Sequence, residues 1–205
     1  KARLKKSFDA AAGFYLPNLR ILTVGDGWPQ IHDNRYFREY KDSDPRHEYM
    51  YTYGKSGEFF RNTKLDWSGF YGFRSDWGFN GADGIGLVLK SGDEAEWHNQ
   101  PDNLTFELRA FGRSLITDAS QQAYGGSTPE VKAMREKYKQ TRVHNTVTLN
   151  NENSGFNHKL NRWIEERLGS GFSYDLFEAQ NVSYEGVTHN RTVIFIDRKY
   201  YVLVD

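Results

Sequence analysis

The feature that most constrains the fold is a change in the period of the apolar residues near residue 66. From that point apolar residues recur at every second position, as in Leu104, Phe106 and Leu108, which alternate with polar neighbours. This period places alternate side chains on opposite faces and is typical of a half-buried β-strand. Further strands are expected over residues 70–73, 87–89, 115–116, 143–149, 192–196 and 200–204. Many short strands separated by turns favour an antiparallel β-sandwich.

The first 65 residues follow a different pattern. Apolar residues recur at three- and four-residue steps up to Pro17, which predicts a helix over residues 1–16. Short helical pieces are expected over residues 34–40 and 47–53, and a charged loop with a short helix over residues 127–140. We therefore expect a helical tail and linker over residues 1–65 and a mainly β, antiparallel sandwich over residues 66–205.

Charge and composition narrow the classes of partner. The chain has 27 basic and 27 acidic side chains and a net charge of zero, which argues against binding nucleic acid or a membrane surface through bulk electrostatics. There is no run of 18 apolar residues, and so no membrane span is expected. Aromatic residues make up 16% of the chain, which suits a binder of sugar faces and an ordinary β core equally well.

The two ends of the sequence indicate a segment cut from a longer chain. The basic start is not followed by the apolar stretch of a signal peptide. The apolar run over residues 200–204 stops at Asp205, without further residues to pair with it. We therefore expect further domains of the same protein outside this sequence.

Polar residues that can carry chemistry stand at the ends of the apolar runs. His98 and Gln100 are two positions apart and would point to one face if they lay in a strand. Asp118 and His144 each stand beside an apolar run. A glutamine oxygen, a carboxylate and an imidazole can together hold one divalent cation. Hydrogen-bonded structural roles for the same residues remain the alternative.

At these residues the sequence resembles a known family. The order His98-x-Gln100-x-Asp102 before an apolar strand, a carboxylate at Asp118, and the run Arg142-Val143-His144-Asn145-Thr146 are similar to the heparinase II/III-like lyases. The resemblance covers roughly residues 66–205. It implies an α/α toroid followed by an antiparallel β-sandwich, with β-elimination on a uronic-acid-containing glycosaminoglycan such as heparan sulfate in the cleft between them.

The resemblance also implies residue roles. His98 matches a catalytic histidine, and Gln100, Asp118 and His144 match a metal triad that holds one structural cation, Ca²⁺ or Zn²⁺. Tyr124 is expected to match a catalytic tyrosine of the cleft, and Asn99 and Arg142 are expected to contact the substrate. A histidine suits proton transfer because it titrates near neutral pH.

The missing toroid domain is the remaining partner that the resemblance implies. In the family it supplies a catalytic tyrosine and a group that neutralises the substrate carboxylate, so the segment alone is expected to be inactive. The resemblance also implies a periplasmic or secreted bacterial protein that meets an acidic polysaccharide.

Two other functions stay open at this point. The first is a lyase for alginate or another polyuronate, and the second is a non-catalytic carbohydrate-binding or structural sandwich. Gln100, in place of a second histidine, favours a heparinase III-like enzyme over an alginate lyase.

Overall fold

The computed structural model describes residues 2–25, 27, 33–81, 83–92, 98–120, 128–168 and 170–205. In this part of the chain the strands form a five-stranded and a four-stranded antiparallel sheet, with one further short pair near the N-terminus. The five-stranded sheet has the order β3 (Thr63–Leu65), β4 (Phe70–Arg74), β5 (Gly86–Lys90), β6 (Phe106–Ala110) and β7 (Arg113–Ile116). The four-stranded sheet has the order β11 (Tyr200–Val204), β10 (Val187–Ile196), β9 (Ser173–Tyr184) and β8 (His158–Leu168). The predicted antiparallel sandwich is therefore confirmed.

The N-terminal region is helical, as predicted. Its elements are α1 (Ala2–Gly13), β1 (Tyr15–Leu16), η1 (Pro17–Leu19), β2 (Arg20–Ile21), η2 (Asn34–Tyr40) and α2 (Pro45–Tyr51). Asp33 and Asp44 cap η2 and α2, because each carboxylate accepts the backbone N–H two residues ahead, at 2.9 and 3.0 Å. The boundary expected near residue 65 stays a prediction.

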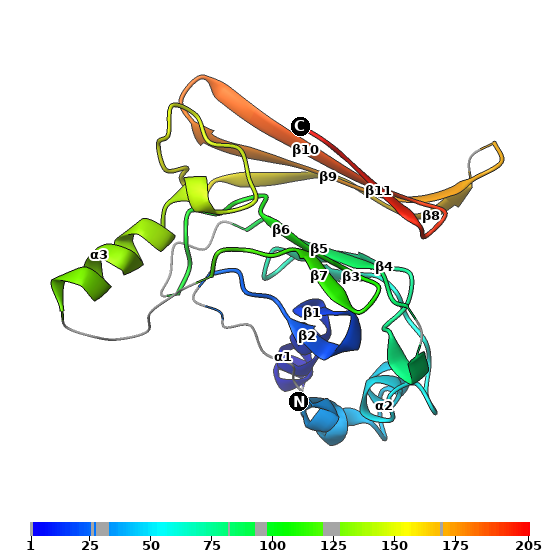
Figure 1. The fold of residues 1–205 in the computed structure, drawn as a ribbon. Coiled ribbons are helices and arrows are strands. Elements are labelled where there is room, and N and C mark those ends of the chain that lie inside the picture. Colours follow the sequence, from blue (N-terminus) through cyan, green and yellow to red (C-terminus); the bar gives the residue numbers. More distant parts are fainter. Residues whose placement is uncertain are drawn as a thin grey trace.

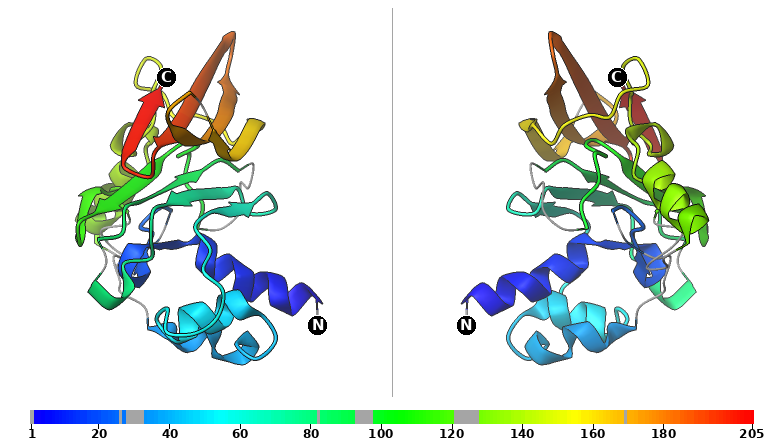
Figure 2. Two further views of the ribbon diagram at one scale, coloured as in Figure 1. Left: turned by 90° about the vertical axis from the view of Figure 1, so that its right-hand side faces the viewer. Right: turned by 90° about the vertical axis from the view of Figure 1, so that its left-hand side faces the viewer.

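The elements stack in three layers, with the N-terminal helices below, the five-stranded sheet in the middle and the four-stranded sheet above (Figures 1 and 2). Between the two sheets lies an apolar core that contains Phe73, Phe177, Val193 and Phe195. Trp163 stacks on Phe73 with ring centroids 4.6 Å apart. Burying each such side chain stabilises the fold by about 1.5–3 kcal/mol.

The other face of the five-stranded sheet is also buried. Val88 on β5 packs against Leu16 and Leu22 of the N-terminal region. Arg74, which is fully buried, donates from Nε to the carbonyl of Tyr15 at 3.0 Å, and its guanidinium lies over the Trp77 ring. Burial lowers the pKa of Arg74 to about 9. The N-terminal region is therefore fastened to the sheet by both apolar packing and hydrogen bonds.

The prediction of a half-buried strand over residues 104–108 was wrong, because the N-terminal region covers the face that was expected to meet solvent. Thr105 and Glu107, expected on the solvent face, are 0% and 2% exposed. Thr23 of the N-terminal region donates from its hydroxyl to the Glu107 carboxylate at 2.8 Å. Glu107 of β6 is thus buried under Thr23, which precedes it by 84 residues in the sequence.

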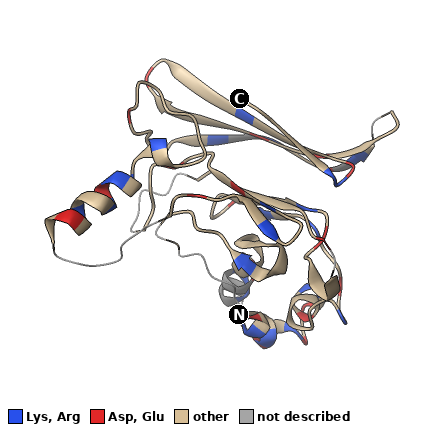
Figure 3. Ribbon diagram, in the orientation of Figure 1, with Lys and Arg blue, Asp and Glu red and all other residues tan. Residues whose placement is uncertain are grey.

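A second prediction was wrong: residues 143–149 do not form a strand. Val143 ends the short helix η4 (Thr141–Val143), residues 144–149 follow it as irregular backbone, and the next strand, β8, begins at His158. Asn145 is held by side-chain bonds to the carbonyls of Phe106 and Thr117 at 3.0 and 2.9 Å, in place of a strand ladder. The helix expected within residues 127–140 is present as α3 (Pro129–Tyr138), whose surface carries both acidic and basic residues (Figure 3). None of the helices in the described ranges is both long and apolar enough to cross a membrane.

Candidate functional site

The structure brings Asp118 and His144 together, at the end of β7 and just after η4. His144 Nδ1 lies 2.8 and 3.0 Å from the two carboxylate oxygens of Asp118. Both side chains are fully buried. With Nδ1 bound to the carboxylate, the Nε2 atom of His144 is buried and has no hydrogen-bond partner among the described residues. Two of the three predicted ligands therefore share one buried polar site.

Neighbouring polar groups fix this pair in position. The hydroxyl of Thr105 donates to Asp118 Oδ2 at 2.8 Å and accepts the backbone N–H of Asn145 at 3.1 Å. Asp118 Oδ1 accepts the backbone N–H of Ser120 at 3.1 Å. The carboxylate is thus held by donors from the residue before β6 and from its own loop, which fix its orientation in a buried position.

Gln100 is also buried, at 1% exposure, and its amide donates to the carbonyl of Gly25 at 3.1 Å. Asp102 donates its backbone N–H to the Gln100 carbonyl at 2.8 Å, and the charges of Asp118 and His144 act on the Asp102 carboxylate. Gln100 is therefore buried and linked through the backbone to Asp102, and the triad with Asp118 and His144 stays a prediction.

His98 does not share a face with Gln100, contrary to the prediction made for a strand. The segment from His98 to Thr105 forms turns, and His98 has a left-handed backbone with φ of 71°. As a result His98 is exposed whereas Gln100 is buried. A left-handed histidine is a strained conformation of the kind that clusters at functional sites.

Gly25 explains how this turn is held. It has φ of 65°, and a Cβ atom built on it would lie 2.7 Å from the backbone oxygen of His98. Only glycine fits so close to another backbone. Because its carbonyl also accepts the Gln100 amide, Gly25 positions the exposed histidine and the buried glutamine together.

A pocket of about 330 Å³ opens beside His98. Its lining includes Phe14, Phe70, Lys90 and Asn99. Lys90 Nζ donates to the side chains of Asn99 and Asp102, and both Lys90 and Asp102 are buried. Burial raises the pKa of the Asp102 carboxyl, while the nearby Lys90 charge opposes the rise. The pocket thus has aromatic walls and polar groups, which suits a sugar, while the charge of Lys90 is already paired with Asp102.

A second buried carboxylate, Glu107, is close enough to Asp118 for their charges to interact. Burial raises the pKa of Glu107 to about 7, and the Asp118 charge adds to this, although two hydrogen bonds from Thr23 oppose it. A cation bound near Asp118 would relieve the repulsion between the two carboxylates.

The remaining predicted residues lie at or beyond the edge of this site. Arg142, on η4, is exposed and makes no ion pair within the described ranges. Asn99 lines the pocket, but it is already bonded to Lys90. Tyr124 lies outside the described residues.

A different group of potential ligands, which the sequence analysis did not single out, lies between α1 and α2. Ligand atoms of Asp9, Asp44 and His47 all lie within 4.8 Å of one another, so this cluster could hold a metal ion. Lys5 and Arg46, however, already form ion pairs with Asp44 at 2.6 and 3.0 Å. These two cations neutralise the carboxylates, which weakens the attraction for a metal.

The sequence analysis also missed Lys90, Thr105 and Glu107 as parts of the site. Thr105 and Glu107 occupy the positions that the alternation assigns to solvent, and Lys90 ends an apolar run. Polar residues at such positions are ordinary on a protein surface. They are unusual here because the structure buries them.

The sequence is similar to known proteins over most of its length. The family described as "Heparinase II/III-like, C-terminal" matches residues 61–205. A heparin-sulfate lyase of Bacteroides stercoris is 37% identical over 82% of this chain and 25% of its own length. A heparin-sulfate lyase of Pedobacter heparinus is 35% identical over 93% of this chain and 29% of its own.

Solved structures show the same fold. The crystal structure of heparan sulfate lyase HepC from Pedobacter heparinus superposes with a TM-score of 0.81 at 32% identity, covering 95% of this chain and 30% of that one. The heparinase III BT4657 gene product gives a TM-score of 0.81 at 30% identity, over 94% of this chain and 30% of its own. The present chain therefore spans less than a third of each relative.

Proposed function

Because this chain belongs to the heparinase II/III-like family, we propose that it forms the β-sandwich part of a polysaccharide lyase that cleaves a heparan sulfate-like glycosaminoglycan by β-elimination. The observation that carries the proposal is an exposed histidine, His98, beside a pocket and held in a left-handed turn against Gly25, in a chain that also holds a buried Asp118–His144 pair. The relatives named above are lyases of heparin or heparan sulfate, which supports the substrate class.

β-Elimination requires two kinds of group, hydrogen-bond donors that neutralise the substrate carboxylate and groups that transfer protons. The proton at C5 of a uronic acid becomes acidic only when the neighbouring carboxylate is neutralised by hydrogen-bond donors. A base then removes that proton, and an acid protonates the departing oxygen at C4. In this proposal His98 is one of the two proton-transfer groups, and Asn99 and Arg142 contact the substrate. Tyr124 is proposed as a second cleft residue on the resemblance alone.

The other catalytic groups are proposed to come from a toroid domain. The family resemblance assigns a tyrosine and a carboxylate-neutralising group to that domain, and the present chain spans under a third of its relatives. We therefore expect residues 1–205 alone to cleave poorly or not at all.

Gln100, Asp118 and His144 are proposed to hold one divalent cation. His144 Nδ1 and the Asp118 carboxylate, 2.8–3.0 Å apart, form a nitrogen and oxygen donor set that would fit Ca²⁺ or Zn²⁺ in place of the hydrogen bond between them. When bound, the cation would supply structural stabilisation, joining the loop after β7 to the loop after η4. The three residues themselves would help to hold the turn that presents His98.

Metal analysis tests this assignment. The purified protein is assayed for bound elements, and its melting temperature is measured before and after chelation. One bound cation and a chelator-dependent fall in melting temperature are expected for the natural sequence, and neither is expected for Asp118→Ala. Asp44→Ala is the matched control, since it removes a buried carboxylate from the Asp9–Asp44–His47 cluster instead. If Asp44→Ala loses the metal and Asp118→Ala retains it, the triad is wrong.

Activity tests the proposed role of His98. Cleavage of heparan sulfate by the full-length protein is followed by the absorbance of the unsaturated uronate product. His98→Ala is expected to lower kcat by about 10²–10⁴-fold, the usual contribution of a general acid or base. His158→Ala, at the start of β8, is the control and should leave kcat within about twofold. An unchanged kcat in His98→Ala would remove His98 from the mechanism.

The same assay separates the alternative functions. Cleavage of alginate in preference to heparan sulfate would identify a different polyuronate lyase. Tight binding of the polymer by the full-length protein without any cleavage would identify a carbohydrate-binding sandwich. We also propose a periplasmic or secreted location, because an acidic polysaccharide of this kind is met outside the cell; cell fractionation tests it.

A further inference from the structure

Trp67 differs from the other tryptophans that the structure describes. Trp77 is fully buried and donates its indole N–H to the Phe60 carbonyl at 2.6 Å. Trp163 is partly buried and donates to Glu165 at 2.7 Å. Trp67, in contrast, is 50% exposed, and its indole N–H has no acceptor within the described ranges. An exposed ring with a spare donor can pack against one face of a ligand and donate to a polar group on it.

The β3–β4 turn fixes the backbone that carries Trp67. The N–H groups of Ser68 and Gly69 both donate to the carbonyl of Leu65, at 3.0 and 2.8 Å. Gly69 has φ of 67°, and a Cβ atom built on it would lie 2.3 Å from the backbone oxygen of Ser91. The Gly69 carbonyl in turn accepts the Ser91 N–H at 2.6 Å. The Trp67 ring is therefore presented from a preorganised backbone, which lowers the entropy cost of binding.

This turn lies at the same end of the five-stranded sheet as His98. Successive antiparallel strands reverse direction, so the β3–β4 turn and the β5–β6 connection, which carries His98, leave the sheet at one end. Ser91 belongs to that connection, and Ser68, the neighbour of Trp67, lines the His98 pocket. Trp67 therefore stands beside the proposed catalytic pocket, on a turn that is bonded to the segment carrying His98.

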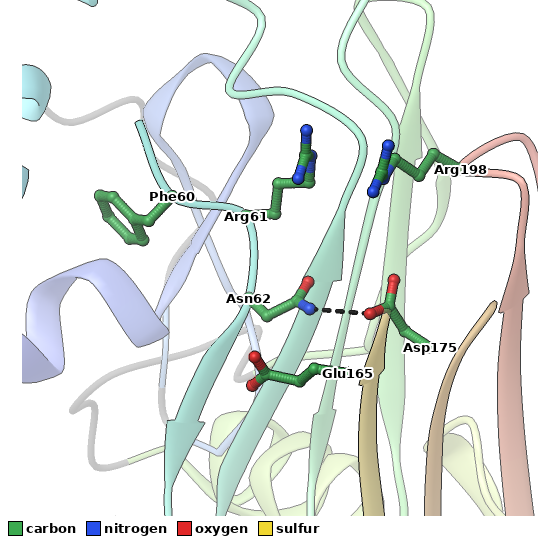
Figure 4. A pocket seen from close by; sticks show the side chains of 6 residues that line it. All are labelled: Phe60, Arg61, Asn62, Glu165, Asp175 and Arg198. Atoms are coloured by element: carbon green, nitrogen blue, oxygen red, sulfur yellow. Dashed lines mark hydrogen bonds between the residues drawn. The ribbon is translucent and has the colours of Figure 1, made fainter. Parts of the chain in front are cut away.

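Trp67 also lines a second pocket, of about 270 Å³. Its other walls come from α1, α2, β3 and the segment before β3, and they include the aromatic ring of Phe60. Phe60 and Asn62 are shared with the pocket drawn in Figure 4, where Asn62 Nδ2 donates to Asp175 of β9 at 3.0 Å and is thereby fixed. Because the residue after Trp67 lines the catalytic pocket, the β3–β4 turn joins two adjacent pockets.

One cation of this second pocket is available to a ligand. Lys6, on α1, is exposed, lines the pocket and forms no ion pair in the part of the chain that the structure describes. The aspartate, the arginine and the other lysine of the pocket already form ion pairs, which join Asp9 to Lys5, Arg46 to Asp44 and Lys64 to Asp66. Lys6 therefore gives the pocket an uncompensated positive charge, which attracts an anionic group.

We propose that Trp67 and this second pocket form a saccharide subsite that continues the cleft at His98, with a sugar ring stacked on the indole and an anionic group of the polymer paired with Lys6. The assignment rests on the proposed function, because it takes the same acidic polysaccharide as the ligand. The C–H groups on one face of a sugar ring pack against the indole, and a hydroxyl group accepts its N–H. A linear polymer that extends out of the His98 pocket reaches this adjoining surface.

The ring of Trp67 supplies a local readout. The full-length protein is labelled with fluorotryptophan, and its Trp67 signal is assigned with Trp67→Tyr. A heparan sulfate octasaccharide is then titrated into the His98→Ala variant, in which cleavage is expected to be slow. The Trp67 ¹⁹F signal is expected to shift with saturation and, without sugar, to show a solvent isotope shift in D₂O because the ring is exposed. A signal that fails either test would overturn the proposal; a missing isotope shift would show that another part of the protein covers the ring.

Calorimetry on the same protein measures the contribution of the ring to affinity. Trp67→Ala should raise the dissociation constant of the octasaccharide by about tenfold, and Trp67→Tyr, which keeps an aromatic ring, by about threefold or less. Phe111→Ala is the matched control, because Phe111 is 63% exposed in the β6–β7 turn at the opposite end of the same sheet. It should change the dissociation constant by less than about twofold. Equal effects of the Trp67→Ala and Phe111→Ala variants would overturn the stacking.

The charge of Lys6 is tested separately. Lys6→Gln should raise the dissociation constant by about fivefold at low ionic strength and by less at high ionic strength. Lys55→Gln removes the same charge from an exposed lysine outside the pocket and should have an effect of less than about twofold. Equal effects of the two variants would overturn the role of Lys6.

Cleavage of heparan sulfate is measured on the same variants with His98 restored. Binding that depends on Trp67, without cleavage, would leave the subsite standing while the proposed lyase function fails. Cleavage by a protein whose binding is unchanged in Trp67→Ala would do the reverse.

Discussion

Replacing Arg191 with methionine tests whether a single side chain clamps the two sheets and the candidate site together. Arg191, on β10, is 4% exposed, and its Nη1 donates to the carbonyls of Leu104 and Asn145, the latter at 2.7 Å. Nε and Nη2 donate to the two carboxylate oxygens of Asp205 at 2.7 and 2.8 Å. One guanidinium thus joins β10, β11, the approach to β6 and the loop that carries His144.

The expected loss follows from these bonds. A hydrogen bond to a charged group contributes about 1.5–3 kcal/mol, so the two bonds to carbonyls together contribute about 3–6 kcal/mol. The Asp205 carboxylate is one-third exposed, at 34%, and the pair with it adds at most about 1 kcal/mol. Methionine keeps an apolar stem beside Phe106, over whose ring the guanidinium lies. We expect Arg191→Met to lower the free energy of unfolding by about 3–5 kcal/mol.

Urea unfolding at neutral pH, followed by circular dichroism, measures this change. Arg162→Met is the control: Arg162 is also on the four-stranded sheet, but it is 53% exposed and, among the described residues, bonds only to Glu178, at 3.3 Å. That variant should lose less than about 1 kcal/mol. If the two variants lose the same free energy, the clamp contributes nothing beyond a surface ion pair and the reasoning is wrong.

Three further predictions test the buried polar groups. The folded-state pKa of Glu107, about 7 against an ordinary 4.5, means that its contribution to stability is fully present below about pH 4.5 and is lost as the pH rises through about 7. Glu107→Gln should therefore remove about 3 kcal/mol of pH dependence over that range, seen as a flatter curve of melting temperature against pH. Lys90→Met leaves the buried Asp102 carboxylate unpaired and should cost about 3–5 kcal/mol in urea unfolding, most of which is restored when Asp102→Leu is added; no restoration would refute the pairing. The hydroxyl of Tyr201 accepts the Leu87 N–H at 3.0 Å across the sandwich, so Tyr201→Phe should cost about 1–3 kcal/mol, whereas Tyr200→Phe, at an exposed position, should be neutral in the same experiment.

The family of this chain could be predicted from its sequence because the motif residues stand in a fixed order around apolar strands. The structure brings Asp118 and His144 into contact and buries Gln100, whereas the metal triad of these three residues stays a prediction. The assumed geometry of His98 was wrong, because spacing by two residues places side chains on one face only within a strand, and residues 98–105 form turns.

By itself the sequence determined the local periods: three to four residues at the N-terminus and two from about residue 66, which fixed a helical start and an antiparallel sandwich. These periods are set by the geometry of each element and the face that it buries, so they can be recognised without knowledge of distant segments. Only the tertiary structure decided that Glu107 is buried, that Gly25 holds the His98 turn, and that Lys6 and Trp67 share a pocket. Each of these facts depends on how separate layers stack, and no local pattern in the chain encodes which distant residue will lie opposite another.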